Sequence, residues 1–188
     1  MGRPTKITRQ EILAAALELV RREGADCLNA RSLAKALGCS TQPVFSNFSS
    51  MEEVRQAVMG QAEEVYQAYL HREMHDGRYP PYKASGIAYI RFAQEERELF
   101  RLLFMRDRTG EAPPEDNIQE ILQLVQQRTG LDPERAWYFH LEMWVYVHGI
   151  ATMLATDYLR WDWPQISRML TDAFLGLRLR YQQEEHHE

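Results

Sequence analysis

Apolar residues recur along most of this chain every three or four positions, which is the spacing of one face of an α-helix. The first run follows a Thr8-Arg-Gln-Glu11 segment that has the spacing of a capping box, and it ends at Gly24. Together these features predict a helix over residues 9–23. The alternation with a period of two that strands require is nearly absent, so the chain is predicted to be all-α. The apolar members of the first run are Ile12, Ala16, Leu19 and Val20.

Two short helices joined by a glycine turn are predicted next. Asn29 can cap a helix that ends before Gly38, and glycine readily adopts the positive φ with which many helices end. Ser40 or Thr41 can cap the following helix, over residues 41–47. This order of elements is typical of a helix-turn-helix unit that binds DNA. The apolar faces of the pair are supplied by Leu33, Ala34, Leu37, Val44 and Phe48.

The outward side of the second short helix has small polar residues that can hydrogen-bond to bases or phosphates. We expect Gln42 to bind adenine through two hydrogen bonds, with Asn47 as a second reader. Thr41 or Pro43 is expected to meet a thymine methyl group. For each residue the alternative is a phosphate contact or simple exposure to solvent. The residues expected at DNA are Lys6, Arg31, Thr41, Gln42, Pro43, Phe45, Ser46 and Asn47.

The remainder of the chain predicts six further helices, the first of which is long enough to connect two domains. The Pro80-Pro81 pair follows that helix, because proline cannot donate a backbone hydrogen bond. A boundary near residue 50 is therefore expected, with a small domain over residues 1–50 and a larger one over 51–188. The expected helices are 51–74, 82–94, 96–105, 117–128, 133–159 and 162–182, with a loop at 109–114.

Charge is distributed unevenly between these two parts. The 188 residues have a net charge of -5, yet residues 1–50 contain seven Lys or Arg against four Asp or Glu, a balance of +3 that leaves -8 for the rest. A basic first part attracts polyanions and an acidic remainder repels them, which favours DNA binding without proving it. Lys6 and Arg3, in an arm ahead of the first helix, are expected to follow the DNA backbone or the minor groove.

Composition points to a globular protein with a buried core, since 45% of the residues are hydrophobic. The most apolar run, residues 143–159, is interrupted by His148 and Asp157 and is too short and too polar to cross a bilayer. No secretion signal is evident at the N-terminus. Cys27 and Cys39 lack further metal ligands at useful spacing, so reduced thiols in a cytoplasmic protein are expected, with no metal and no cofactor.

Residues 9–54 show the order helix, Gly24, helix, Gly38-Cys-Ser, second short helix, Phe48-Ser-Ser and Glu52-Glu53-Val54. In this order and spacing the segment resembles the DNA-binding head of the TetR family of transcriptional regulators. Beyond this segment the likeness is one of architecture. The segment from Trp144 to Gly149, Trp-Val-Tyr-Val-His-Gly, is also similar to a Trp, His, Gly motif of one subgroup. The resemblance implies a ligand cavity among the later helices and a homodimer formed mainly by the last two.

Two residues depart from the common pattern of that family. Phe45 stands where the family usually has tyrosine, and Met51 stands where a lysine is common. Both usual residues would reach phosphates. Their loss predicts fewer phosphate contacts and a shallower dependence of DNA binding on salt, with binding itself retained.

Candidate effector residues come from the aromatic side chains of the later helices, namely Tyr66, Phe104, Trp144 and His148. Trp144 and His148 are one helical turn apart, so they are expected either to meet a ligand together or to belong to the core, with His148 bonded to a neighbouring carbonyl. His71 and His75 have metal-compatible spacing, but two solvated side chains are the favoured interpretation. Gly149 would permit a close approach of helices. The residues expected at a dimer interface are Tyr158, Ile166, Leu170, Phe174 and Leu177.

The sequence therefore predicts a ligand-responsive DNA-binding regulator rather than an enzyme. No nucleophile elbow, phosphate loop or metal motif is present in it. The expected partners are double-stranded operator DNA, a largely apolar small-molecule effector and a second copy of the chain. A repressor released from a palindromic operator is the expected form, because a ligand that favours wrongly spaced heads lowers operator affinity. The alternative is a helical dimeric interaction or ligand-binding protein whose DNA binding is weakened or lost.

Overall fold

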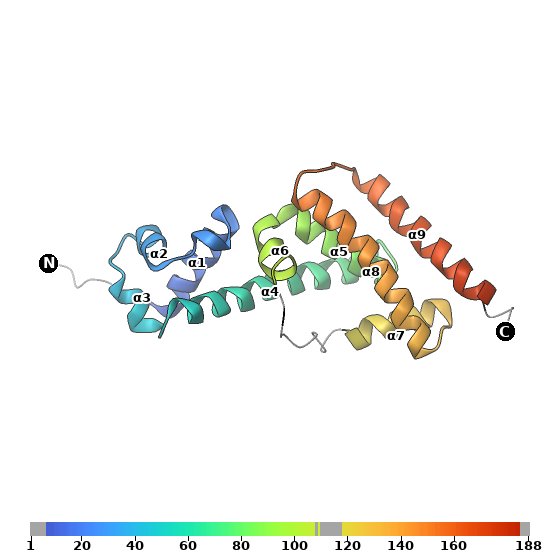
Figure 1. The fold of residues 1–188 in the computed structure, drawn as a ribbon, viewed down its shortest axis with the longest axis horizontal. Coiled ribbons are helices and arrows are strands. Elements are labelled where there is room, and N and C mark those ends of the chain that lie inside the picture. Colours follow the sequence, from blue (N-terminus) through green and yellow to red (C-terminus); the bar gives the residue numbers. More distant parts are fainter. Residues whose placement is uncertain (1–6, 108, 110–117, 185–188) are drawn as a thin grey trace. The chain divides into compact units, whose positions relative to one another are not determined.

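A computed structural model describes residues 7–107, 109 and 118–184, and every regular element in these ranges is helical (Figure 1). The predicted all-α class is confirmed. The elements are α1 (Arg9–Glu23), the 3-10 turn η1 (Ala25–Cys27), α2 (Ala30–Ala36), α3 (Gln42–Asn47), α4 (Met51–His75), α5 (Pro81–Glu95), α6 (Arg97–Phe104), α7 (Ile118–Thr129), α8 (Pro133–Ala155) and α9 (Trp163–Glu184).

The first two helices begin with the caps that the sequence predicts. At α1 the Thr8 hydroxyl accepts a hydrogen bond from the Glu11 amide at 3.2 Å, and the Glu11 carboxylate accepts one from the Thr8 amide at 2.8 Å. At α2 the Asn29 side chain accepts hydrogen bonds from the amides of Arg31 and Ser32, both at 3.0 Å. These bonds satisfy amides that have no partner within the helix, which fixes where each helix begins.

One predicted helix is shorter in the structure than the sequence suggests. The expected helix over residues 133–159 ends at Ala155, and Asp157 lies in the left-handed region with φ of 54°. The apolar residues that follow Ala155 extended the periodic pattern without extending the helix. The expected loop at 109–114 falls almost entirely outside the described residues.

The described chain divides into two compact units. The head unit consists of the described residues up to Gln67 together with Glu96–Arg106, and the body unit consists of Ala68–Glu95 together with the described residues from Asp107 onward. In the head unit, α1 packs against α2, α3 and α6. Its fully buried side chains include Ile12, Val20, Leu33, Val44, Val54 and Leu99.

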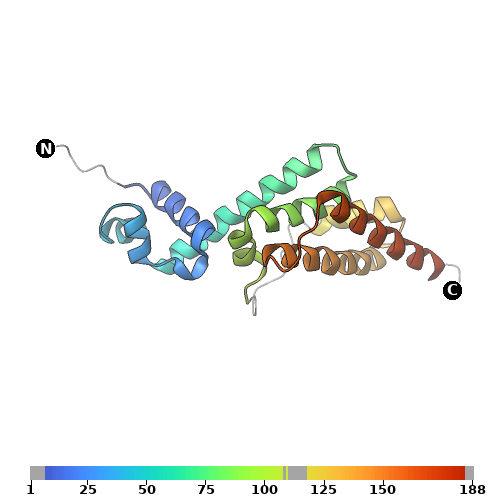
Figure 2. The ribbon, with the colours of Figure 1, turned by 90° about the horizontal axis from the view of Figure 1, so that it is seen from above.

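In the body unit, α5 packs most extensively against α8, and both figures show the two helices side by side (Figures 1 and 2). Helices α7 and α9 each pack against α5 and α8. Apolar residues of α5 and α8 fill the space between them, because both helices present buried residues at helical spacing. The largest fully buried side chains of this unit are Phe92, Phe139, Ile87, Ile90 and Ile166.

The division into compact units rests on packing, whereas the expected boundary near residue 50 separates two functions. The head unit extends past residue 50 to include most of α4, and it takes in α6 from the middle of the sequence. The functional boundary between residues 1–50 and 51–188 stays a prediction. Among the described residues, none of the helices is both long enough and apolar enough to span a membrane.

Candidate functional site

The turn between α2 and α3 contains two backbone hydrogen bonds that end α2 and redirect the chain. Gly38 has φ of 65°, as predicted. The Gly38 amide donates to the Lys35 carbonyl at 3.2 Å and the Cys39 amide donates to the Ala34 carbonyl at 3.0 Å. This pair of bonds is a Schellman motif, which satisfies the last carbonyls of α2 and sets the direction in which α3 leaves.

Helix α3 begins without the side-chain cap that the sequence predicts. Thr41 is the N-cap residue, but its backbone is helical and its hydroxyl makes no capping hydrogen bond. An N-cap side chain reaches the amides of the first turn from an extended backbone, and the second residue of this turn is Pro43, which has no amide hydrogen. The expectation that Ser40 or Thr41 caps α3 through its side chain is therefore corrected.

The two faces of α3 differ sharply in exposure. Val44 is fully buried and Phe48 is nearly so, as predicted for the inner face. Gln42 and Ser46 are exposed, and 51% of Phe45 is open to solvent. An aromatic ring with this exposure on a six-residue helix has little role in the protomer core, so the outer face of α3 is available to a partner.

Not all the expected DNA contacts are equally available. The Asn47 side-chain amide donates to the Pro43 carbonyl at 2.8 Å and to the Ile7 carbonyl at 3.4 Å, so its donor group is already used within the head unit. Thr41 and Pro43 are half-buried. Arg31, in the first turn of α2, is exposed. Lys6 and Arg3 lie outside the described residues.

The four residues expected at an effector site separate into two pairs, one in each compact unit. Tyr66 and Phe104 meet edge to face in the head unit, with ring centroids 5.2 Å apart, and burial raises the pKa of the Tyr66 hydroxyl. Trp144 and His148 stack in the body unit, with ring centroids 5.1 Å apart. The structure thus brings the predicted residues together within each pair.

His148 lies within hydrogen-bond distance of a tyrosine side chain on α5. The Tyr89 hydroxyl lies 2.9 Å from its Nδ1 atom, and which of the two donates depends on the tautomer of the imidazole. Burial lowers the pKa of His148 and favours its neutral form. Trp144, which stacks on the imidazole, is substantially exposed.

A second Tyr–His pair, absent from the sequence-based site, lies two helical turns away. The Tyr82 hydroxyl is 3.1 Å from Nδ1 of His140, and burial lowers the pKa of this histidine to about 4. His140, Trp144 and His148 follow one another at intervals of four on α8, while Tyr82 and Tyr89 are seven apart on α5. These spacings were visible in the sequence and indicate two facing rows of polar aromatic residues.

The residues expected at a dimer interface are partly buried inside the protomer instead. Ile166 is fully buried and Leu170 is 3% exposed, so neither can contact a second chain. Phe174 and Leu177 pack against the cluster around Phe139 in the same body unit. Of the five, only Tyr158 is largely exposed. The exposed apolar residues of α8 and α9 are not among the five that were predicted.

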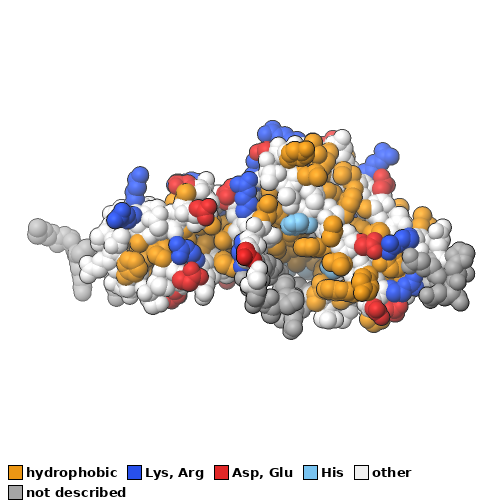
Figure 3. Space-filling model, in the orientation of Figure 1, with side chains coloured by type: hydrophobic (Ala, Val, Ile, Leu, Met, Phe, Trp, Pro, Cys, Tyr) orange, Lys and Arg blue, Asp and Glu red, His pale blue; other side chains and the backbone are white. Residues whose placement is uncertain are grey.

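Exposed hydrophobic side chains gather over α8 in the space-filling view (Figure 3). Val145 on α8 and Leu179 on α9 are each 60% exposed. A Cβ placed on Gly149 would meet no atom within 4 Å. The predicted close approach of another helix at Gly149 is therefore not found within the protomer. Other exposed hydrophobic residues of these helices are Trp137, Tyr138, Leu141, Met153 and Leu175.

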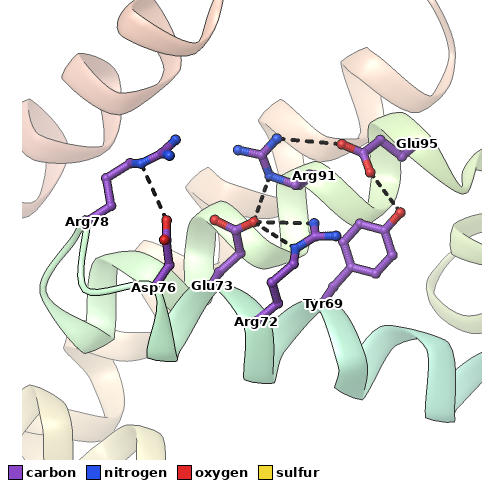
Figure 4. A network of polar contacts seen from close by, with 7 residues as sticks. All are labelled: Tyr69, Arg72, Glu73, Asp76, Arg78, Arg91 and Glu95. Carbon is purple, nitrogen blue, oxygen red and sulfur yellow. Dashed lines mark hydrogen bonds and ion pairs between the residues drawn. The ribbon is translucent and has the colours of Figure 1, made fainter.

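A network of ion pairs and hydrogen bonds joins α4 and α5 in the body unit (Figure 4). Glu73 at the end of α4 is 6% exposed, and its carboxylate pairs with Arg91 of α5 at 2.9 Å and with Arg72 at 3.3 Å. The Arg91 guanidinium also lies 4.2 Å from the centroid of the Trp163 ring, at the start of α9. Glu95 accepts a hydrogen bond from the Tyr69 hydroxyl at 2.8 Å. Because a buried carboxylate needs such partners, the network fixes α4 against α5.

No group of three or more potential metal ligands was found among the described residues. His71 and His75 stack on each other at the end of α4, and Nδ1 of His75 is 2.8 Å from the carbonyl of His71. Cys27 and Cys39 are free thiols.

Comparison with known proteins gives the same family on the later part of the chain. Residues 82–175 match the family model described as the tetracyclin repressor-like C-terminal domain. This segment is half of the chain, and it is the part in which the sequence alone showed only an architectural likeness.

Relatives and solved structures agree with this match. An HTH-type transcriptional regulator of Mycobacterium tuberculosis is 26% identical over 201 residues, which cover 94% of this chain and 83% of the relative. A TetR family member from Streptomyces coelicolor has a TM-score of 0.59 at 18% identity, covering 90% of this chain and 98% of its own. A TetR variant from Acinetobacter baumannii, solved in complex with minocycline, has a TM-score of 0.59 at 19% identity, covering 95% and 98%. The chain belongs to the TetR family of transcriptional regulators.

Proposed function

We propose that this protein is a ligand-responsive repressor that binds a palindromic operator as a homodimer. The observation that best supports the proposal is the geometry of α3. A Schellman turn sets its direction, Val44 and Phe48 anchor its inner face, and Gln42 and Phe45 remain exposed on its outer face. A short helix held in this way is suited to enter the major groove of DNA.

A dimer would place two such helices in successive major grooves, about 34 Å apart or further by whole turns. The operator would then be a near-palindrome. The exposed apolar residues of α8 and α9 support the dimer, because exposed surfaces of this kind mark interfaces between chains. Repression would require only that the bound dimer occupy the promoter.

The effector is proposed to be a largely apolar small molecule bound in the family's C-terminal domain. The Acinetobacter baumannii structure was solved with minocycline, which supports small-molecule binding in this fold. The facing Tyr–His pairs of α5 and α8 offer neutral hydrogen-bonding groups beside the exposed Trp144 ring. An effector that binds better when the heads are wrongly spaced would lower operator affinity by its differential binding free energy. A regulator of this kind acts where the chromosome is, which agrees with the expected cytoplasmic location.

The test is to select duplexes from a random-sequence pool with the purified full-length protein, and then to measure affinity for the selected duplex by fluorescence anisotropy. Gln42→Ala is expected to weaken binding about fivefold or more and to relax the preference at one base-pair position, since a good base contact gives roughly 1–3 kcal/mol of discrimination. Gln127→Ala, at an exposed position of α7, is the matched control and should bind as the wild type does.

Failure to enrich any sequence would overturn the proposal and favour the alternative, an interaction or ligand-binding protein that no longer reads DNA. Once an operator is selected, a thermal-shift screen of apolar compounds identifies effectors. A true effector should both raise the melting temperature and release the selected duplex.

A further inference from the structure

Helix α3 is not stable by itself. It is only six residues long, it contains Pro43, and it has no side-chain cap at its start. Isolated helices of this length are unstable in water, so the structure of α3 depends on contacts from outside the helix. The last residue of α3 is Asn47, whose carbonyl lies at the helix end where unpaired carbonyls concentrate negative potential.

Arg9, the first residue of α1, supplies three contacts at this point. Its guanidinium lies 3.9 Å from the centroid of the Phe48 ring, directly after α3. Its Nη1 atom donates to the Asn47 carbonyl at 2.7 Å and also pairs with the Glu53 carboxylate at 2.9 Å. One planar cation therefore joins the start of α1, the end of α3 and the first turn of α4.

The groups around Arg9 are themselves fixed. Glu53 accepts hydrogen bonds from the Ser49 amide at 2.7 Å and from the Ser49 hydroxyl at 2.8 Å, and these bonds, followed by that from Arg9, lower the pKa of the Glu53 carboxyl. The Asn47 side chain bonds to the Ile7 carbonyl, just ahead of α1. The charge of Arg9 is thus used on a carboxylate and a helix end inside the head unit.

We propose that Arg9 is a positioning residue for the DNA-reading helix, acting through Asn47, Phe48 and Glu53 rather than through a phosphate. The proposal rests on the DNA-binding function proposed above. It separates two roles that a basic residue near a helix-turn-helix can have. A phosphate contact strengthens binding to every duplex about equally, whereas correct placement of α3 matters only for the sequence that α3 reads.

The experiment compares Arg9→Met and Arg9→Lys with the wild type on the selected duplex and on a scrambled duplex, each over a range of salt concentrations. Arg9→Met is expected to weaken binding to the selected duplex about tenfold or more and to change binding to the scrambled duplex less than about twofold. The salt slope should stay unchanged, because no phosphate contact is lost. Arg9→Lys should recover only part of the loss, since lysine lacks the planar fork that stacks on Phe48 while donating to two acceptors.

Arg22→Lys is the matched control, because Arg22 is an exposed residue of the same helix that pairs only with its neighbour Glu23 in the contacts described. Melting curves by circular dichroism set the assay temperature well below the transition of each variant. If an Arg9 variant fails to fold, Glu53→Gln tests the same arrangement, because it keeps the side-chain shape while removing the charge that orients Arg9. It should also lower selectivity between the two duplexes.

Equal losses on both duplexes together with a smaller salt slope would overturn the proposal and make Arg9 a phosphate contact. Wild-type affinity of every variant for the selected duplex would overturn it as well. Both results leave the proposed DNA-binding function intact. Absence of any selected duplex for the wild type would instead overturn that function and this inference together.

Discussion

At the scale of single residues, burial disfavours the charged form of the two histidines that bond to tyrosines of α5. Each has a tyrosine hydroxyl at Nδ1, and for each burial is the cause that lowers the pKa. The effect is larger for His140, the more deeply buried of the two. A neutral imidazole at these positions adds no positive charge between α5 and α8 at physiological pH.

This burial predicts a pH dependence of stability. The folded pKa of His140 is about 4 and its ordinary value is 6.5, so its contribution is complete above pH 6.5 and is lost as pH falls toward 4. Between pH 7 and pH 5 the wild type should lose about 2 kcal/mol of unfolding free energy relative to His140→Gln, measured by urea denaturation. Parallel pH profiles for the wild type and His140→Gln would show that His140 is not held neutral by burial.

At the scale of secondary-structure elements, helix ends could be predicted from the sequence because their causes are local. Thr8, Asn29 and Gly38 each act within four residues, and each forms the contact that the sequence predicts. The predicted side-chain cap at Thr41 was wrong because the Thr41 backbone is helical. The predicted end of α8 was wrong because apolar residues continue past Ala155 in the sequence. Only the structure shows that the chain turns at Asp157.

The functional side chains were harder to predict, because they depend on how each helix is rotated about its axis. The stripe on α9 was identified correctly as apolar, yet Ile166 and Leu170 face the protomer core. The sequence contains no sign of which side of a two-sided apolar helix meets its own domain. For the same reason the partnership of His140 with Tyr82, 58 residues apart, emerges only when α5 and α8 are packed.

The left-handed conformation in the turn between α2 and α3 can be tested by comparing Gly38 with Gly60. Both glycines belong to the head unit, but their backbone conformations differ. A Cβ on Gly38 or on Gly60 would meet no atom within 4 Å. Gly38 has φ of 65°, whereas Gly60 lies within α4. Gly38→Ala should therefore lower the unfolding free energy by about 1–2 kcal/mol, and Gly60→Ala should raise it by up to about 1 kcal/mol, in urea titrations. Equal effects of both substitutions would contradict the role of the left-handed conformation at Gly38.

At the scale of the whole molecule, the proposed operator geometry requires a second chain, and the outer residues of α8 and α9 are where it should bind. Val145 and Leu179 are the most exposed aliphatic residues of these helices, at 60% each. Large exposed apolar areas are rare on proteins that stay monomeric, because their burial stabilises an assembly by about 25 cal/mol for each Å² removed from water.

Val145→Glu and Leu179→Glu should each leave the protomer folded, because both side chains lie outside its core, while placing an unpaired carboxylate in the interface. The mass measured by light scattering at micromolar concentration should fall from twice 22.1 kDa toward the single-chain value. Met105→Glu changes an exposed apolar residue of the head unit, 42% open to solvent, and should remain dimeric. Because one head reads only half of a palindrome, the dissociated variants should also lose affinity for the selected duplex at low protein concentration and regain it as concentration rises. A dimer that survives both substitutions would place the interface on another surface of the chain.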